Sequence, residues 1–163
     1  MKEYYRTLLK ELLKALKNRF KEKLYCMVIY GSVARDEAKP DSDIDILLVI
    51  EDLPKSRLER QKLFIEVEEK IRPFIDELWD KGIYIDFSPI ILTPSEAQRL
   101  RPLYLDMVDD AVIIYEKNGF FTNILRRLKK KLKEMNARKV HVGKRWYWVL
   151  KEPYVPGEVI EVE

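Results

Sequence analysis

The stretch GSVARDEAKPDSDIDILLV, residues 31–49, decides the fold and the site that this 163-residue chain is expected to have. It begins where an apolar run over residues 24–30 ends, and such a run is typical of a buried strand. Gly31 and Ser32 end that strand, residues 35–42 form a polar loop, and a second strand is expected over residues 43–50. The stretch therefore carries polar and acidic side chains between two buried strands, where we expect a functional site.

Two aspartates at the start of the second expected strand favour a metal site. Asp43 and Asp45 are two residues apart, so both carboxylates point to the same face of a strand. Neighbouring carboxylates repel each other unless a cation lies between them. Oxygen ligands suit Mg²⁺ or Mn²⁺ better than zinc. The alternative is a solvated strand end in which Asp43 caps a turn, but Gly31 and Ser32 upstream favour the metal site.

A third acid, Asp86, lies in another expected strand, over residues 83–92. Its neighbours Ile85 and Phe87 occupy the opposite face of that strand. If this strand lies beside the second one, three carboxylates converge, and such a group can hold two metal ions about 4 Å apart. The alternative for Asp86 is an ordinary salt-bridged acid on an edge strand.

Gly31, Ser32 and Arg35 predict an anion site close to these acids. Glycine lets the backbone approach a ligand closely, and a serine that begins a turn or helix offers free amides to phosphate oxygens. Arg35 is one turn further on and can reach the same phosphates with its fork of donors. The alternatives are a helix N-cap for Ser32 and a solvated loop charge for Arg35. Together with the carboxylates, these residues indicate a nucleoside triphosphate and its metal.

These residues resemble a known signature, GSxARG…SDxDLLV, of the DNA polymerase β-like nucleotidyltransferase superfamily. The chain is most similar to the small stand-alone prokaryotic members, the minimal nucleotidyltransferases. The resemblance implies a small mixed sheet flanked by helices. It also implies that Asp43 and Asp45 are the metal-binding pair, that Asp86 is the third acid, and that Gly31 and Ser32 bind the triphosphate. One departure is Asp36, which stands where the family commonly has glycine.

The resemblance implies an activity and a partner. The enzyme would move a nucleoside monophosphate from an NTP, with ATP expected, to a hydroxyl acceptor and release pyrophosphate. Asp43, Asp45 and Asp86 would be catalytic, with Mg²⁺ or Mn²⁺ as cofactor. Many minimal members act with a helical HEPN partner as the antitoxin of a toxin–antitoxin pair, and some modify a partner tyrosine with AMP. The alternative is a catalytically weak or inactive nucleotide-binding module that regulates a protein or RNA partner by docking.

The rest of the chain predicts an α+β fold with a mixed sheet. Helices are expected over residues 1–20, over residues 56–81 with a kink or split at Pro73, and over residues 121–135. One or two short helices are expected over residues 93–110, and a further strand over residues 111–116. The tail carries the β-prone pieces KVHV, RWYWVL and EVIEV. We expect one domain over residues 1–163, with a core of about residues 1–116 and a helix and β-rich tail over residues 120–163.

Composition excludes several classes of protein. The chain is 47% hydrophobic and 36% charged, which excludes a disordered protein, and its Lys and Glu content is a weak sign of a heat-adapted source. The single cysteine, Cys26, excludes an internal disulfide and is expected in the core. No uncharged stretch approaches the ~20 residues of a membrane span. A cytoplasmic location is therefore expected.

The net charge of +3, from 31 basic and 28 acidic residues, is too small to indicate that the chain as a whole binds a polyanion. A dense basic run over residues 126–133 is either the solvated face of a helix or an RNA-binding surface: Arg126, Arg127, Lys129, Lys130, Lys131 and Lys133. Trp146 and Trp148 are expected on one strand face, where they cover the fold or stack on bases. A homodimer through the tail strands is a further hypothesis.

Overall fold

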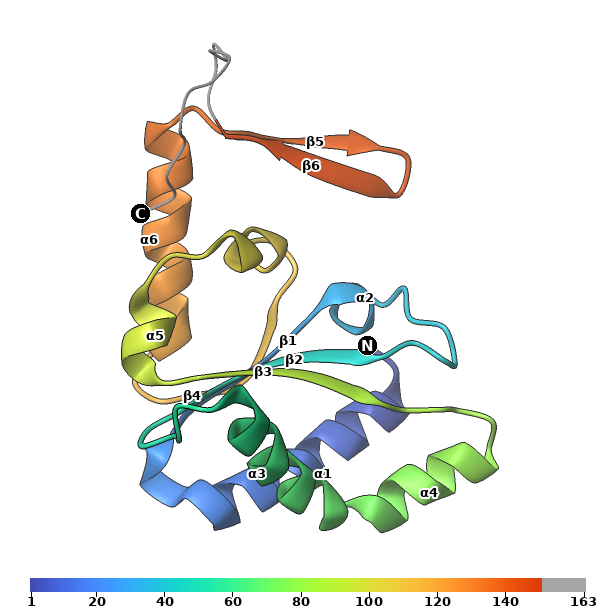
Figure 1. Cartoon of the computed structure of the whole chain (residues 1–163). Helices are drawn as coiled ribbons and strands as arrows, with labels where there is room; N and C mark the ends of the chain where they lie inside the picture. Colours follow the sequence, from blue (N-terminus) through green and yellow to red (C-terminus); the bar gives the residue numbers. More distant parts are fainter. Residues whose placement is uncertain (151–163) are drawn as a thin grey trace.

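A four-stranded mixed sheet forms the centre of the protein, as the computed structural model of residues 1–150 shows (Figure 1). Its strands lie in the order β3-β2-β1-β4. The strands are β1 (Leu24–Tyr30), β2 (Ile44–Ile50), β3 (Phe87–Leu92) and β4 (Val112–Glu116). β1 is antiparallel to both β2 and β4, whereas β2 and β3 are parallel. The expected α+β fold with a mixed sheet is confirmed.

The central strands β1 and β2 are buried on both faces, which explains why their sequences are continuous apolar runs. Alternate side chains enter two separate hydrophobic cores because successive strand residues point to opposite faces. Ile44, Ile46 and Leu48 lie in one core, and Leu47 and Val49 lie in the other. Cys26 is fully buried in the second core, as expected.

Three helices cover one face of the sheet, drawn below it in Figure 1: α1 (Glu3–Phe20), α3 (Arg57–Glu69) and α4 (Arg72–Asp80). The helical stretch expected over residues 56–81 is split at Pro73, which lies in the first turn of α4. Proline is tolerated there because the amide that it lacks would have no partner within the helix. No helix in residues 1–150 is long and apolar enough to cross a membrane.

The other face carries shorter elements and the last helix. These are α5 (Pro94–Gln98), the 3-10 helix η2 (Pro102–Asp106) and α6 (Phe120–Glu134). Two further short helices flank β1, namely η1 (Lys21–Lys23) and α2 (Gly31–Ala34). The buried Tyr104 of η2 donates its hydroxyl hydrogen to the Ala97 carbonyl and packs edge-on against Phe121 of α6, with ring centroids 5.5 Å apart. This contact joins η2, α5 and α6 into one layer.

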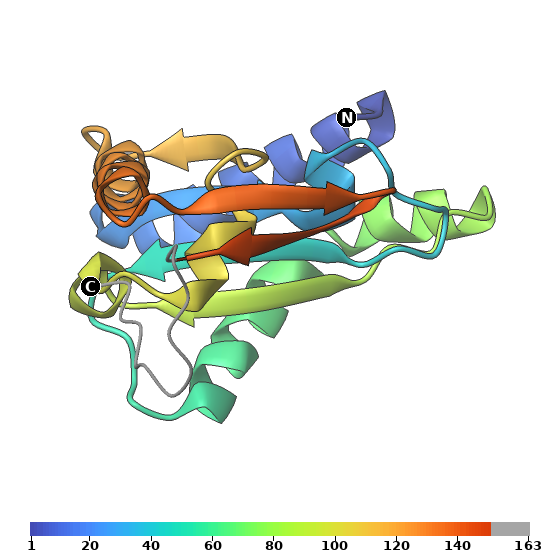
Figure 2. The ribbon, with the colours of Figure 1, turned by 90° about the horizontal axis from the view of Figure 1, so that it is seen from above.

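A β-hairpin follows α6 and lies above the sheet. Its strands are β5 (Arg138–Val142) and β6 (Arg145–Val149), which pair in antiparallel fashion. Seen from above, the hairpin runs across the sheet towards α2 and the loop that precedes β2 (Figure 2). The expected pieces KVHV and RWYWVL form this hairpin, whereas EVIEV lies outside the described residues.

The third strand is shorter than the sequence predicted. It begins at Phe87 rather than at residue 83, because the preceding backbone groups have partners elsewhere. The Tyr84 amide donates to the Pro40 carbonyl (2.9 Å), and the Trp79 indole donates to the Ile85 carbonyl (3.3 Å). Asp86 therefore lies just before β3 rather than within it.

Side chains of α3 protect the outer edge of β3. The Arg60 guanidinium donates to the Ile91 carbonyl (3.1 Å) and to Glu96 (2.8 Å), and Gln61 donates to the Pro89 carbonyl (3.1 Å). These donors satisfy groups that would otherwise offer an edge for pairing with another chain. Burial raises the pKa of Glu96, but the hydrogen bonds from Thr93 and Arg60 outweigh it and lower this pKa to about 2.

We expect Glu96→Gln to change the acid stability of the protein. A carboxylate whose pKa falls on folding stabilises the native state above its unfolded pKa of 4.5, and this contribution disappears as the pH falls through 4.5 towards 2. The variant should be about 1 kcal/mol less stable at about pH 6, a modest loss because Glu96 is partly exposed, and equally stable at about pH 2. Urea unfolding at both pH values measures this difference. Glu77→Gln, in an exposed ion pair with Lys81, is the control, and a pH-independent difference for Glu96→Gln would contradict the prediction.

Candidate active site

The predicted site residues lie at one end of the sheet, where β1 ends and β2 and β3 begin. Tyr30, the last residue of β1, pairs with Asp45, and Gly31 opens α2 directly after it. On the other side of β2, Ile44 pairs with Phe87 of β3, and the Ile44 amide donates to the Asp86 carbonyl (2.8 Å). The third strand therefore does lie beside the second, which is the condition under which Asp86 was expected to approach Asp43 and Asp45.

Asp45 occupies a partly buried and negatively charged position. Asp43, Asp45 and the buried Leu47 alternate along the chain, which places both acids on the face that carries the hairpin. Burial raises the pKa of Asp45, the charge of Asp43 raises it further, and Arg35 acts in the opposite direction. Asp106 of η2 also raises this pKa. A cation bound between Asp43 and Asp45 would relieve this repulsion.

Gly31 makes a close contact with Asp45. Its φ of +74° lies in the left-handed region, which glycine adopts without strain. A β-carbon at this position would overlap the Oδ2 atom of Asp45. The structure therefore explains why glycine follows β1, since only a residue without a side chain lets the chain turn into α2 against the carboxylate.

Arg35 ends α2 and lies between the acids and the hairpin. Its Nε donates to Glu37 (3.1 Å), and its Cζ lies 4.4 Å from the centre of the Trp146 ring. Its positive charge is one of the groups that set the pKa of Asp45. With these contacts, the Arg35 side chain is largely covered and only 20% exposed.

Asp36 adopts a left-handed backbone conformation, with φ of +59°. Aspartate tolerates this region better than most residues, and glycine adopts it freely, which explains how either residue can follow the arginine. The exposed Asp36 carboxylate lies 3.6 Å from the Met1 amino group. It thus has a partner away from Asp43 and Asp45.

Asp86 stands apart from the other two acids. Continuing the β2–β3 register places it beside Asp43, but its Oδ1 accepts a hydrogen bond from the Phe87 amide (2.9 Å). Its charge helps to raise the pKa of Glu68 on α3, after burial of Glu68 itself. Within residues 1–150, no three His, Cys, Asp or Glu side chains are close enough together to hold a metal ion. Asp86 could join Asp43 and Asp45 only after its side chain rotates and breaks this hydrogen bond.

Three residues of this site were not predicted from the sequence. Tyr30 faces Asp45, and burial followed by the charges of Asp45 and Asp106 raises the pKa of its hydroxyl to about 12. Asp106 belongs to no motif, and only the fold brings it to the acids. Trp146 was expected on one strand face with Trp148, covering the fold or stacking on bases, but nothing in the sequence indicated its contact with Arg35.

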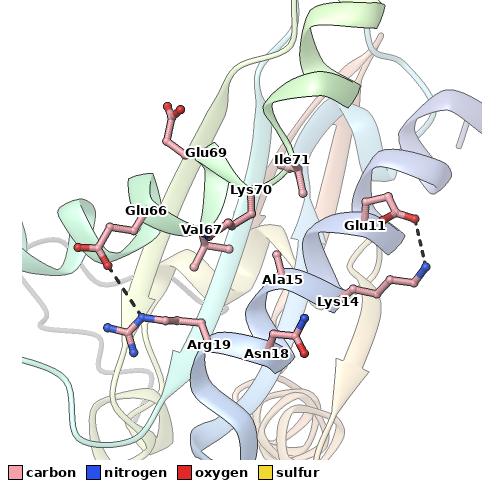
Figure 3. A pocket seen from close by; sticks show the side chains of 10 residues that line it. All are labelled: Glu11, Lys14, Ala15, Asn18, Arg19, Glu66, Val67, Glu69, Lys70 and Ile71. Carbon is pink, nitrogen blue, oxygen red and sulfur yellow. Dashed lines mark hydrogen bonds and ion pairs between the residues drawn. The ribbon is translucent and has the colours of Figure 1, made fainter.

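The donor set fits a divalent cation. Asp43 and Asp45 supply carboxylate oxygens on one face, and Mg²⁺ is commonly held by one or two carboxylates together with substrate phosphates and waters. A separate groove of about 890 Å³ lies between α1 and the α3–α4 region (Figure 3). Ala15, Val67 and Ile71 line it together with charged residues, and none of the predicted site residues does.

We expect Gly31→Ala to be more harmful than Gly82→Ala. Both glycines have positive φ, but a β-carbon at Gly82 meets nothing within 4 Å. Gly82→Ala should therefore cost only the backbone strain of about 1 kcal/mol, whereas Gly31→Ala must also displace Asp45 and should cost about 3 kcal/mol. Denaturant unfolding of the two variants measures the difference. Equal losses of stability would show that the contact between Gly31 and Asp45 is not tight.

Comparisons with known proteins agree with this geometry. The family described as "Nucleotidyltransferase domain" matches residues 9–99. The "Putative protein adenylyltransferase MJ1305" of Methanocaldococcus jannaschii is 29% identical over 141 residues, which cover 85% of this chain and 90% of that protein.

One solved structure shares the fold. Spectinomycin adenyltransferase AAD(9) from Enterococcus faecialis, solved with ATP and spectinomycin, matches with a TM-score of 0.50 and 18% identity over 80% of this chain and 66% of that one. A chain of a toxin–antitoxin structure with AMP-PNP matches with a TM-score of 0.47 and 16% identity over 78% of this chain and 91% of that one. The family match spans more than half of the sequence and contains Gly31, Ser32, Asp43, Asp45 and Asp86. The protein is therefore a member of the nucleotidyltransferase domain family.

Proposed function

We propose that this protein transfers AMP from ATP to a hydroxyl group of a protein acceptor and releases pyrophosphate. The observation that carries the proposal is Asp45, which lies against Gly31, feels the charge of Arg35 and has Asp43 on the same face of the chain. The name of the Methanocaldococcus relative, "Putative protein adenylyltransferase MJ1305", supports both ATP as donor and a protein as acceptor.

Each residue has a role in the proposed reaction. Gly31 and Ser32 bind the triphosphate through backbone amides, and Arg35 contributes charged donors to the same oxygens. Asp43 and Asp45 hold Mg²⁺ or Mn²⁺, with Asp86 as a third ligand after rotation of its side chain. The bound cation supplies positive charge that offsets the triphosphate and the departing pyrophosphate.

The proposed step is a displacement at the α-phosphorus. The acceptor oxygen forms a bond to this phosphorus while the bond to the oxygen that bridges the α- and β-phosphates breaks. Pyrophosphate leaves with that oxygen, and the hydroxyl proton passes to a carboxylate of the site. Asp86 is our candidate for the carboxylate that accepts this proton, because it is exposed and next to Asp43 when the β2–β3 register is continued.

A helical HEPN-type protein is the first acceptor to test. The family resemblance implies such a partner, in a toxin–antitoxin pair whose antitoxin would be this protein. In that arrangement a tyrosine hydroxyl of the partner would receive AMP. The other protein acceptor to test is a second copy of this chain. Transfer to it would give a labelled band at the mass of this protein.

We expect Asp45→Asn to abolish transfer. The experiment incubates the protein with Mg²⁺ or Mn²⁺ and each α-labelled NTP, in extract of its source organism and with a co-expressed HEPN partner. A labelled protein band that forms with ATP and disappears with Asp45→Asn supports the proposal. Asp80→Asn, the same chemical change at an exposed position of α4, should transfer normally.

Failure of transfer has two separable meanings. Metal-dependent ATP binding without transfer, together with normal partner neutralisation by Asp45→Asn, would support the regulatory binding module instead. Absence of ATP binding as well would overturn the proposed function.

An RNA acceptor is the second candidate, favoured by the uneven distribution of charge. Residues 126–149 contain ten Lys and Arg residues and one acid, although the whole chain has a net charge of only +3. In α6, Lys129, Lys130 and Lys133 are exposed. This end of the chain therefore has the electrostatic character of a polyanion-binding surface.

Replacing Lys129, Lys130 and Lys133 with Gln tests the RNA candidate. If RNA lies on α6, the variant should bind a labelled single-stranded RNA more weakly. The slope of the logarithm of the affinity against the logarithm of the salt concentration should also become shallower, by up to about one unit per lysine. The control replaces Lys10, Lys14 and Lys62, which are exposed on the opposite helical layer. Equal RNA binding by both variants would show that the α6 lysines form only a solvated face.

A further inference from the structure

The hairpin that follows α6 reaches the candidate active site through Trp146. This residue lies on β6, far beyond the segment 9–99 that matches the family. Its ring centre is 4.4 Å from the Arg35 guanidinium carbon and 4.7 Å from the Lys139 ammonium nitrogen. Arg35, which is expected to bind phosphate, and Lys139 thus contact the same indole ring.

The hairpin has one face towards the rest of the protein and one towards solvent. In its register, Lys139, Trp146 and Trp148 share the inner face. The neighbouring Tyr147 lies on the outer face and is 54% exposed. Trp146 is therefore directed to the site by strand alternation.

Other contacts hold the hairpin in place without Trp146. The Trp148 indole donates to the Leu105 carbonyl (3.2 Å). Lys139 forms ion pairs with Asp109 (3.2 Å) and Asp110 (3.6 Å), and its side chain is only 13% exposed. The position of Trp146 thus follows from the hairpin, and its removal should leave the hairpin attached.

Contact with an indole face positions a guanidinium while leaving its donors free. The N–H groups of arginine lie in the plane of the guanidinium, whereas stacking on an aromatic ring uses its face. The Arg35 Nε is bonded to Glu37, but within residues 1–150 its two terminal nitrogens have no hydrogen-bond partner. These terminal nitrogens remain available to a ligand beside Asp45.

We propose that Trp146 is a positioning residue that keeps Arg35 beside the Asp43–Asp45 pair, so that the terminal donors of Arg35 meet the triphosphate. The inference rests on the proposed nucleotide site and extends it to the hairpin. Trp146 acts here through Arg35 and does not stack on the base. The active site then includes a segment that the family match does not contain.

Nucleotide binding by four variants tests this inference. Calorimetry with ATP and with AMP, each with Mg²⁺, measures the affinities of Trp146→Ala, Trp146→Phe, Arg35→Ala and the Arg35→Ala/Trp146→Ala double variant. Tyr147→Ala is the matched control, since it removes the adjacent aromatic ring from the outer face of the same hairpin. Circular dichroism confirms that each variant is folded.

The expected results separate positioning from a structural role. Trp146→Ala should weaken ATP binding about tenfold and AMP binding much less, because the loss concerns the β- and γ-phosphates. Trp146→Phe should restore most of the affinity, and Tyr147→Ala should bind as the unmodified protein does. The double variant should bind ATP no more weakly than Arg35→Ala alone, because both changes remove one interaction.

Other outcomes overturn the inference and leave the proposed function intact. Equal losses for ATP and AMP would show that Trp146 contacts the base or the α-phosphate, and additive losses in the double variant would show that it acts independently of Arg35. ATP binding by Trp146→Ala that equals binding by Tyr147→Ala would also overturn it. If the unmodified protein fails to bind ATP, the proposed function itself fails.

Discussion

The contact between Gly31 and the Asp45 carboxylate fixes the geometry of the whole site. It requires β1 and β2 to pair in one register, because a shift of one residue would turn Asp45 to the opposite face of the sheet. It also requires a residue without a β-carbon where β1 ends. The apolar strands that form the core therefore also determine where the acids and the start of α2 lie. In this fold, the strand register therefore also determines the geometry of the candidate site.

Negative charge accumulates at this end of the sheet, and the surrounding elements compensate it. Burial raises the pKa of Asp45, the charges of Asp43 and Asp106 raise it further, and Asp109 and Asp110 lie just before β4 at the same end. The compensating charges are Arg35 from α2 and Lys139 from β5, which both contact the ring of Trp146. Lys139 neutralises the acids before β4, and Arg35 offsets the acids of β2. The charge that remains around Asp43 and Asp45 favours a bound cation.

The sequence predicted the elements that depend on local patterns and missed those that depend on distant contacts. Apolar runs predicted β1 and β2, and Pro73 predicted the split between α3 and α4. Motif spacing also predicted that Gly31 and Asp45 belong to one site. The predicted start of β3 was wrong by four residues. The reason is that the Tyr84 amide donates to the Pro40 carbonyl, in a loop more than forty residues earlier in the chain. Such a pairing leaves no trace in the periodicity of either segment.

The contact of Trp146 with Arg35 also depends on distant parts of the chain, so it could not be predicted from the sequence. Alternation in RWYWVL showed that Trp146 and Trp148 share a face, but not what that face meets. The answer depends on where α6 ends and on the anchoring of Trp148 to Leu105 and of Lys139 to Asp109. A hairpin anchored on η2 brings an aromatic ring to Arg35, the arginine that we propose binds phosphate, without using any of its donors.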